Sequence, residues 1–382
     1  MDETNPVNEV LLVRGGQPFF DEMIHLIEQA REYLQLMFYI FEEDKTGNMV
    51  LDALSAAAQR GVIVYFIVDG YGSKPFSDNR QQDLRRAGVR FRAFAPIQGI
   101  RFSSVGRRMH TKAIVCDHKM AMVGGVNISD KYHGDDAHPA WLDYAVKVKG
   151  PACQRLHSLY ELFWKRSFLK LRRIRNKEKI IHEIMRKGDH ANWLINDRLR
   201  GFNLISKSYF LALHKAKKEI IILNSYFWPG IKLIQELRAA GDRGVSIKLI
   251  LPALSDSIIF RNATRYFYKV LFQIRNTEIY EWNQSVLHGK VALTDDNWAT
   301  VGSYNLNMLS AFRSIELNAV ITDNTFVRNM RAEMDGVMDA CDRIDPDDFT
   351  KRTGFLGYFL NMLSYYLLHI GLLALLFFSR KD

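Results

Sequence analysis

The same reactive residue types recur at one spacing in two places along this chain. The first copy, HTKAIVCDHKMAMVGGVN, runs from His110 to Asn127, and the second, HGKVALTDDNWATVGSYN, runs from His288 to Asn305. Both fit the pattern H-x-K-x(4)-D-x(6)-G-[GS]-x-N. A single H-x-K carries no information, but two copies that agree at five kinds of position indicate a duplicated unit.

The repeated residues could act on a phosphodiester. Two units facing each other would form a pocket with two imidazoles, two ammonium groups and two side-chain amides. Fixed positive charge and amide donors suit the oxygens of a phosphodiester. One imidazole could attack phosphorus while the other protonates the leaving oxygen. The alternative is two core histidines, but it does not explain why lysine, glycine and asparagine recur at the same offsets.

The alternation of side chains along a strand assigns faces within each motif. HTKAIVCD is short and apolar, as a buried strand should be, so His110 and Lys112 point to one face and Asp117 to the other. This parity favours a structural role for the aspartate, and it is the same for His288, Lys290 and Asp295.

Small residues and amides close each motif. The pairs Gly124-Gly125 and Gly302-Ser303 are expected to let the backbone approach a ligand closely. Asn127 and Asn305 then supply neutral amide donors to it.

A carboxylate in an apolar strand follows each motif. Asp143 lies in WLDYAVKV and Glu316 in SIELNAVI. A buried carboxylate needs a partner, and the nearest candidate by topology is a motif histidine. A carboxylate on the second ring nitrogen would hold the imidazole in one tautomer and make it a better base.

These motifs resemble the paired HKD motifs of the phospholipase D superfamily. Further stretches are similar to the bacterial cardiolipin synthase branch, most closely to the short cardiolipin synthase B type without N-terminal membrane helices. They are DGYGS (69–73), RRMHTK (107–112), GGVNIS (124–129), SYFWPG (225–230) and LHGKVALTDDNWATVGSYNL (287–306). The resemblance covers about residues 8–345.

The resemblance implies a set of site residues and a metal-free reaction without a cofactor. It makes His110 the nucleophile and His288 the general acid, then base. The candidate catalytic residues are His110, Lys112, Asp117, Asp143, His288, Lys290, Asp295 and Glu316; the candidate substrate-binding residues are Gly125, Asn127, Ser303 and Asn305. A second cluster, HGDDAH (133–138), fits no standard metal-ligand spacing, so no metal is expected there.

Strand and helix patterns alternate in the same order in both halves. In the first half we expect a helix near residues 19–35, a buried strand at 36–41, a helix at 49–59 and a strand at 62–70. The second half repeats this order at 205–218, 219–227, 231–244 and 245–252. The sequence therefore predicts an α/β protein of two tandem phospholipase D-like lobes, whose central mixed sheets pack face to face. Gly88 and Asn276 are expected at equivalent left-handed turns.

Composition is consistent with an anionic partner on a cytosolic face. The 382-residue chain is 48% hydrophobic, enough for a sizeable core, and carries a net charge of +10. Its three cysteines, an odd and scattered set, favour reduced thiols. The acidic N-terminal stretch does not resemble a signal peptide.

Three basic or aromatic segments have both a lipid-related and an ordinary interpretation. Arg101, Phe102, Arg107 and Arg108 could form a lip over the pocket or a solvated loop. The basic connector at 165–187 could contact a membrane surface or be a plain linker. Residues 258–275 could line an acyl-chain entry or form a core helix.

The C-terminal stretch contains no charged residue between Arg352 and Arg380. The 24 residues from Phe355 to Phe378 are long enough to span hydrocarbon as a helix. Asn361, Tyr365 and His369 form a mildly polar stripe that suits a helix lying in the interface nearly as well. A core helix is disfavoured because the two lobes are already complete.

The sequence thus predicts a first lobe at 1–165, a basic connector at 166–200, a second lobe at 201–345 and a membrane-anchoring tail at 354–379. The resemblance implies cardiolipin synthesis from two phosphatidylglycerol molecules at the cytoplasmic face of the bacterial inner membrane. Whether phosphatidylethanolamine also serves stays open. The first alternative function is that of a phospholipid hydrolase. The second is that of a nuclease of the same superfamily, and the apolar tail argues against it. The third is that of a catalytically silent membrane-binding protein, which the intact motifs disfavour. The expected partners are phospholipids and an anionic membrane surface, without nucleic acid.

Overall fold

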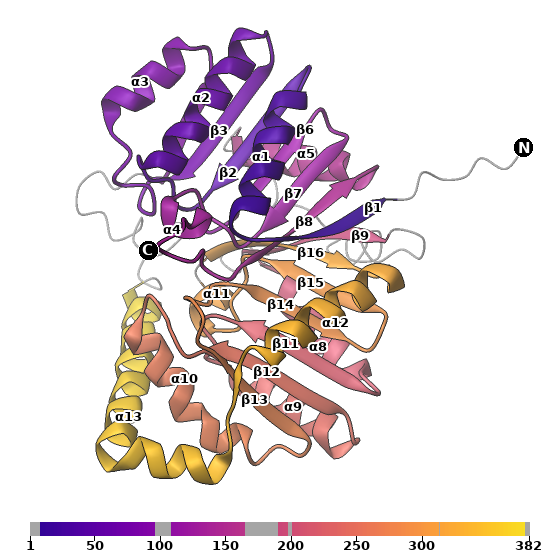
Figure 1. Ribbon diagram of the computed structural model, residues 1–382, viewed down its shortest axis with the longest axis vertical. Helices are drawn as coiled ribbons and strands as arrows, with labels where there is room; N and C mark the ends of the chain where they lie inside the picture. The colour runs from indigo at the N-terminus through magenta and orange to yellow at the C-terminus, as the bar shows by residue number, and fades with distance from the viewer. Residues whose placement is uncertain (1–7, 96–107, 165–189, 198–200, 313, 379–382) are drawn as a thin grey trace, which may run out of the picture.

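The computed structural model describes residues 8–95, 108–164, 190–197, 201–312 and 314–378. They form two stacked α/β lobes, the first above the second in Figure 1, with a long C-terminal helix along one edge of the second lobe. This confirms the predicted fold class.

The first lobe contains a seven-stranded mixed sheet with the order β1-β8-β7-β6-β2-β3-β4. Strands β2, β3 and β4 are parallel, and the remaining neighbours are antiparallel. The strands are β1 (Glu9–Arg14), β2 (Tyr33–Phe38), β3 (Ile63–Asp69), β4 (Arg90–Phe94), β6 (Ala113–Cys116), β7 (Met120–Gly124) and β8 (Tyr144–Lys149), and the helices are α1 (Gln17–Gln29), α2 (Lys45–Gln59), α3 (Asp78–Arg86), α4 (Asp130–His133) and α5 (Ala152–Trp164).

The second lobe repeats this arrangement. Its main strand order is β10-β9-β16-β15-β14-β11-β12-β13-β17, and the short strand β5 (Arg108–Met109) joins it beside β16. The strands are β9 (Ala191–Asp197), β10 (Phe202–Asn203), β11 (Glu219–Asn224), β12 (Ser246–Pro252), β13 (Thr277–Trp282), β14 (Lys290–Thr294), β15 (Trp298–Gly302), β16 (Ser314–Ile321) and β17 (Asp342–Arg343), and the helices are α8 (Leu204–Lys215), α9 (Ile231–Asp242), α10 (Ile258–Leu271), α11 (Met308–Phe312), α12 (Asn324–Asp339) and α13 (Pro346–Phe378).

The duplication extends further than the sequence patterns indicated. Strand β1 pairs antiparallel with β8, and β9 pairs antiparallel with β16 in the equivalent place. Neither β1 nor β9 was predicted as a strand. Because β9 spans Ala191–Asp197, the second sheet begins inside the stretch assigned to the connector. The rest of that connector, 165–189 and 198–200, lies outside the described residues.

Apolar side chains from both sheets form one core between the lobes. Val123 and Val146 from the first sheet share this cluster with Val291, Val301 and Leu317 from the second. Each lobe has one further apolar cluster, which lies between its sheet and its outer helices. Burial on both faces explains why the central strands consist of nearly continuous apolar runs.

Local chemistry accounts for several element boundaries. Helix α2 begins at Lys45, earlier than predicted, because the Asp44 carboxylate caps it by accepting a hydrogen bond from the Gly47 amide. Gly88 and Asn276 have φ of 98° and 56°, so the predicted left-handed turns are confirmed.

The tail helix α13 packs along α10 and bends at Gly354, whose φ is 56°. Its polar stripe faces the protein: Asn361 is buried, and the Tyr365 and His369 rings contact Trp228. The opposite face exposes large apolar side chains, Phe355, Leu356, Phe359, Leu360, Leu363, Tyr366, Leu367, Ile370 and Leu373. The stripe therefore does not mark the solvent side of an interfacial helix; it marks the side that contacts the protein.

Candidate active site

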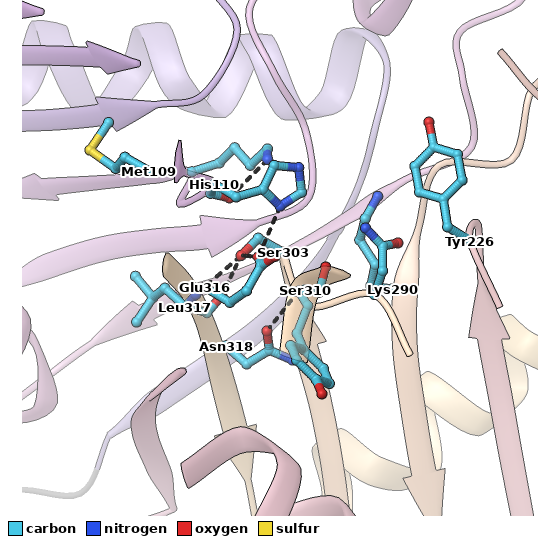
Figure 2. Close-up of polar contacts among 12 residues, drawn as sticks. Met109, His110, Tyr226, Lys290, Ser303, Ser310, Glu316, Leu317 and Asn318 are labelled. Atoms are coloured by element: carbon cyan, nitrogen blue, oxygen red, sulfur yellow. Dashed lines mark hydrogen bonds and ion pairs between the residues drawn. The ribbon is translucent and has the colours of Figure 1, made fainter. Parts of the chain in front are cut away.

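His110 is held at the boundary of the two lobes. The strand before it, β5, pairs in parallel with β16 of the second lobe, and the His110 amide donates to the Ile315 carbonyl at 2.9 Å. This docking places His110 Nδ1 2.9 Å from the Glu316 carboxylate. The imidazole keeps 14% of its side chain exposed while Glu316 is fully buried. Figure 2 shows His110, Glu316 and Ser303 joined by polar contacts, with Lys290 and Tyr226 beside them.

His288 is held by equivalent contacts with the opposite lobe. The amides of His288 and Gly289 both donate to the Leu142 carbonyl of the first lobe at 2.8 Å. The next residue, Asp143, accepts from His288 Nδ1 at 2.6 Å through one oxygen and from the Tyr144 amide at 2.7 Å through the other. The His288 side chain is only 5% exposed.

Each histidine therefore takes its carboxylate from the opposite lobe. The sequence predicted that Asp143 and Glu316 would partner motif histidines but left the pairing open. Because Glu316 pairs with His110 and Asp143 with His288, neither lobe contains a complete histidine–carboxylate pair. The arrangement can orient both imidazoles with Nε2 available for chemistry and Nδ1 bound to an acid.

The two motif lysines are buried beside the histidines. Lys112 Nζ donates to the His110 carbonyl at 2.9 Å, and Lys290 Nζ lies 3.0 Å from His288 Nδ1 and bonds the His288 carbonyl. Burial lowers the pKa of Lys290 to about 8 and holds that of Lys112 well below its usual range. Burial makes these charges costly, so an anionic ligand would stabilise them.

Burial also sets the protonation state of the two imidazoles by lowering their pKa values. It lowers the pKa of His288 to about 4, with Lys290 adding to the effect and Asp143 opposing it. The pKa of His110 is lowered by burial as well, against the pull of Glu316. Burial alone would raise the pKa of Asp143, but Lys290 and the His288 hydrogen bond outweigh it and hold that pKa below its ordinary value. At neutral pH the free site contains two neutral imidazoles and an ionised Asp143.

We expect the folded protein to lose stability as pH falls from 6.5 to about 4. In the unfolded chain His288 takes up a proton below 6.5, whereas in the folded chain it does so only near 4. Unfolding is then linked to proton uptake, and His288 alone contributes about 3 kcal/mol that disappears across this window. Urea unfolding in mild detergent at pH 7 and pH 4.5 measures the loss. His288→Gln should show a smaller acid loss; an equal loss would contradict the assignment.

Asp117 and Asp295 lie away from the histidines. Asp117 accepts the backbone amides of residues 31–33 at 2.8–2.9 Å, and Asp295 accepts those of residues 217–219 at 2.8–3.3 Å. Each sits beyond the end of its strand, so Asp295 is roughly 16 Å along the chain from Lys290. In the structure they fix the start of β2 and β11; a catalytic role for either aspartate stays a prediction.

The small residues of the motifs make room for neighbouring protein groups. A Cβ on Gly125 would lie 2.3 Å from the Asp143 carboxylate, and one on Gly302 would lie 2.4 Å from Asn318. Ser303, the residue equivalent to Gly125, donates its hydroxyl to Glu316 at 2.5 Å. Gly125 thus leaves room for the Asp143 carboxylate and Ser303 binds that of Glu316, while a contact of either residue with the substrate stays a prediction.

The two motif asparagines differ in the hydrogen bonds that their side-chain amides already make within the protein. Asn127 is fully buried; its side-chain oxygen accepts the Ile40 amide, and one of its two side-chain N–H groups donates to the Tyr132 hydroxyl at 2.8 Å. Its predicted contact with the substrate stays a prediction. Asn305 accepts from Ser225 at 2.9 Å, which directs its amide nitrogen the other way.

Sequence reasoning assigned no role to Tyr132 or Asp69. The Tyr132 hydroxyl lies 3.3 Å from His288 Nε2, the ring atom that would exchange protons with a substrate. Asp69 is buried and accepts the Met109 amide at 2.9 Å, which fixes the backbone next to His110. Tyr132 lies five residues after Asn127, and this spacing by itself gave no signal; Asp69 belongs to the quoted DGYGS stretch, which could have indicated it.

Other predicted features lie at the edge of the described chain or beyond it. Arg101, Phe102 and Arg107 of the proposed lip fall outside the described residues. Arg108 reaches Asp69 at 3.5 Å and the Ala95 carbonyl at 3.0 Å. In the HGDDAH stretch, His138 contacts Asp135 at the surface, and within the described ranges no group of three or more His, Cys, Asp or Glu side chains could hold a metal ion.

Known structures of other proteins share this architecture. A phosphatidylserine synthase from Haemophilus influenzae superposes with a TM-score of 0.72 over 95% of this chain and 93% of its own, at 13% identity. A polyphosphate kinase from Porphyromonas gingivalis superposes with a TM-score of 0.54 over 85% of this chain and 49% of its own, at 15% identity. At these identities the likeness defines the fold alone, that of a two-lobed α/β protein.

Sequence comparison narrows the class to a family. The family described as "Cardiolipin synthase, PLD-like domain" matches residues 23–156 and 209–338. Cardiolipin synthase B of Salmonella typhimurium is 36% identical over 367 residues, covering 91% of this chain and 84% of the relative, and the Escherichia coli K12 protein of that name is 36% identical over 351 residues with the same coverage. The chain therefore belongs to the cardiolipin synthase family of phospholipase D-like phosphatidyltransferases, and the two relatives named here are of the cardiolipin synthase B type.

Proposed function

We propose that this enzyme joins two phosphatidylglycerol molecules into cardiolipin and releases glycerol. The observation that carries the proposal is the exchanged pair of histidine–carboxylate contacts, in a chain whose relatives are cardiolipin synthases. Two oriented imidazoles with two buried lysines suit transfer of a phosphodiester between two alcohols.

The first step transfers the phosphatidyl group to the enzyme. Nε2 of His110 attacks phosphorus and a P–N bond forms. The bond from phosphorus to the oxygen of the headgroup glycerol breaks, while the diacylglycerol stays on phosphorus. His288, protonated, gives its proton to that oxygen. Because the substrate phosphate is negative, its binding favours protonation of an imidazole whose pKa burial holds low in the free site.

The second step regenerates the enzyme. The terminal hydroxyl of a second phosphatidylglycerol loses its proton to the now neutral His288, and its oxygen attacks phosphorus while the P–N bond breaks. Lys112 and Lys290 offset the charge on the transferring group. Phosphatidylethanolamine as an alternative donor would use the same steps with ethanolamine as the leaving group.

Product identification tests this function. The purified full-length protein is given phosphatidylglycerol in detergent, and the products are identified by mass. Cardiolipin with equimolar glycerol supports the proposal, and His110→Ala supplies the control. Phosphatidic acid as the main product would make the enzyme a hydrolase, in which water replaces the second lipid.

We also propose that α13 attaches the enzyme to the cytoplasmic face of the cell membrane. The most apolar 18-residue window of the helix has a mean hydropathy of 1.3, and only 17% of that window is buried against the protein. Its buried side rests on Trp228, whose amide bonds the Leu306 carbonyl in the loop after the second motif. This contact supports a membrane surface close to the catalytic boundary, and the positive net charge suits anionic lipids.

Four substitutions on the outer face of α13, Leu356→Gln, Leu363→Gln, Leu367→Gln and Ile370→Gln, should together release the protein from membranes. Each removes exposed apolar surface without touching the face that packs on α10. We expect membrane partitioning to fall by more than about 10³-fold, measured by flotation with anionic vesicles.

The control for this prediction is Leu11→Gln with Leu211→Gln, two exposed leucines elsewhere. Retention of the fourfold variant would assign the attachment to the basic surface instead. Complete removal of the tail, by a chain ending at Thr353, is a weaker test. It would also expose Trp228 and Tyr266, which α13 covers, so the fold is not expected to stay undisturbed.

A further inference from the structure

A cavity of about 800 Å³ lies between α10, the tail helix α13 and the segment around β17. Its lining includes four arginines, Arg261, Arg265, Arg343 and Arg352. None of its lining residues belongs to the histidine motifs. The catalytic reaction proposed above makes no use of this space.

The carboxylates of the cavity already have partners within the protein. Glu281 accepts two hydrogen bonds from Arg265, at 2.9 and 2.5 Å, and one from the Tyr268 hydroxyl at 2.8 Å. Asp342 accepts from Asn283 at 2.8 Å. The charge of Glu281 is therefore offset by Arg265, whereas Asp342 is bound to a neutral amide.

The two carboxylates at the start of α13 also have partners within the protein. Asp345 accepts the amides of Asp347 and Asp348 at 2.9 and 3.1 Å and caps the helix. Asp348 lies 3.7 Å from Arg352. Arg343, the remaining lining cation with a carboxylate partner, pairs with Glu278.

Arg261 is different. In the part of the chain that the structure describes, its guanidinium has no carboxylate partner: Nη1 donates to the Ala253 carbonyl at 3.3 Å, and Nε is buried without a hydrogen-bond partner. Burial lowers its pKa, and so does Arg265 one helical turn away on α10. Glu281, which binds Arg265, opposes this lowering only in part. The buried Nε donor without an acceptor favours an anion beside Arg261.

The rim of the cavity is apolar. Ile258 and Leu360 line it and are 64% and 46% exposed. Leu360 belongs to the exposed apolar face of α13 described above. A small hydrophilic anion would gain nothing from this rim, whereas a molecule with an anionic head and hydrocarbon chains would contact both parts.

We propose that the cavity binds the phosphodiester headgroup of an anionic phospholipid, with Arg261 as the main contact and the acyl chains lying along the apolar face of α13. This is a second lipid site, separate from the catalytic histidines, and it does not depend on the transfer reaction. It gives the tail helix a polar anchoring point at the level of the headgroups.

The chain contains a local reporter for this site. Cys341 lines the cavity and is partly exposed, while Cys116 and Cys153 are buried in the first lobe. Burial raises the pKa of Cys341 to about 12, so its alkylation by a small neutral maleimide at pH 9 is slow enough to follow by peptide mass. Alkylation of Cys116 or Cys153 would report unfolding.

The test uses the full-length protein in neutral detergent, in a His110→Gln background so that the lipid is not consumed. Dihexanoyl phosphatidylglycerol should slow alkylation of Cys341. Arg261→Gln should raise the concentration that gives half protection by about tenfold, since a charged hydrogen bond is lost. Arg261→Lys should retain part of the protection, and Arg238→Gln, an exposed arginine of α9 that does not line the cavity, should change nothing.

Two outcomes would overturn the site itself: no protection by the lipid, or undiminished protection in Arg261→Gln with Cys116 and Cys153 still unreactive. Equal protection by inorganic phosphate would overturn the lipid as occupant. Equal protection by dihexanoyl phosphatidylcholine would overturn the requirement for an anionic lipid. Cardiolipin synthesis is not measured, so failure here leaves the proposed function untouched.

Discussion

His110→Ala is expected to lower turnover by at least about 10⁴-fold, because it removes the atom that forms the covalent bond to phosphorus. The structure offers two histidines with similar surroundings, so turnover alone does not assign roles. His110 is the more exposed of the two and is held by Glu316, while His288 is enclosed by Tyr132 and Trp141. Greater access for phosphorus at His110 supports it as the nucleophile.

A substrate with a good leaving group separates the two roles. A nitrophenyl ester of phosphatidic acid needs little acid assistance, so His288→Ala should form the phosphatidyl-enzyme and then fail to release it for want of a base. Acid quenching and peptide mass should find the label on His110. His110→Ala should trap nothing. Label on His288 in the His110→Ala protein would exchange the roles.

Glu316→Gln and Asp143→Asn are expected to lower turnover by about 10³-fold each with little change in unfolding free energy. Either amide keeps the shape of the side chain but removes the negative charge that stabilises an imidazolium and fixes its tautomer. The bonds concerned are those of 2.9 Å to His110 and 2.6 Å to His288. Turnover and urea unfolding, measured on the same samples, separate a catalytic defect from a loss of fold.

Asp117→Asn provides a matched control for this pair. It makes the same change of carboxylate to amide within a motif, but at a residue that binds the backbone of residues 31–33. We expect it to lower stability and to leave the turnover of folded protein within about threefold of the parent. Full activity of both Glu316→Gln and Asp143→Asn would show that neither acid orients a catalytic histidine.

The two variants also probe the boundary between the lobes. If each acid acts only on the histidine it contacts, Glu316→Gln should impair formation of the phosphatidyl-enzyme from the nitrophenyl ester, whereas Asp143→Asn should mainly slow its release. Single-turnover measurements with that ester resolve the two steps. Equal effects on both steps in both variants would indicate a general disturbance of the boundary.

The sequence by itself determined the duplication, the fold class and the reactive groups. Repetition at fixed spacing identifies His110, Lys112, His288 and Lys290 without any coordinates, because chemistry requires particular residue types. The sequence favoured a structural role for Asp117 and Asp295, and both accept backbone amides, although each lies beyond the end of its strand, where strand parity no longer applies. Periodicity located most central strands because continuous burial leaves a continuous apolar run.

Only the tertiary structure decided which side chains meet. Glu316 binds His110 and Asp143 binds His288 because β5 pairs with β16 and Leu142 accepts the amide of His288, contacts between residues more than a hundred positions apart. The same is true of Asn127, which donates one hydrogen bond to Tyr132, and of the tail stripe, which faces Trp228. A linear pattern specifies the face on which a residue lies. What that face contacts depends on how the two sheets pack together, and local spacing carries no information about that packing.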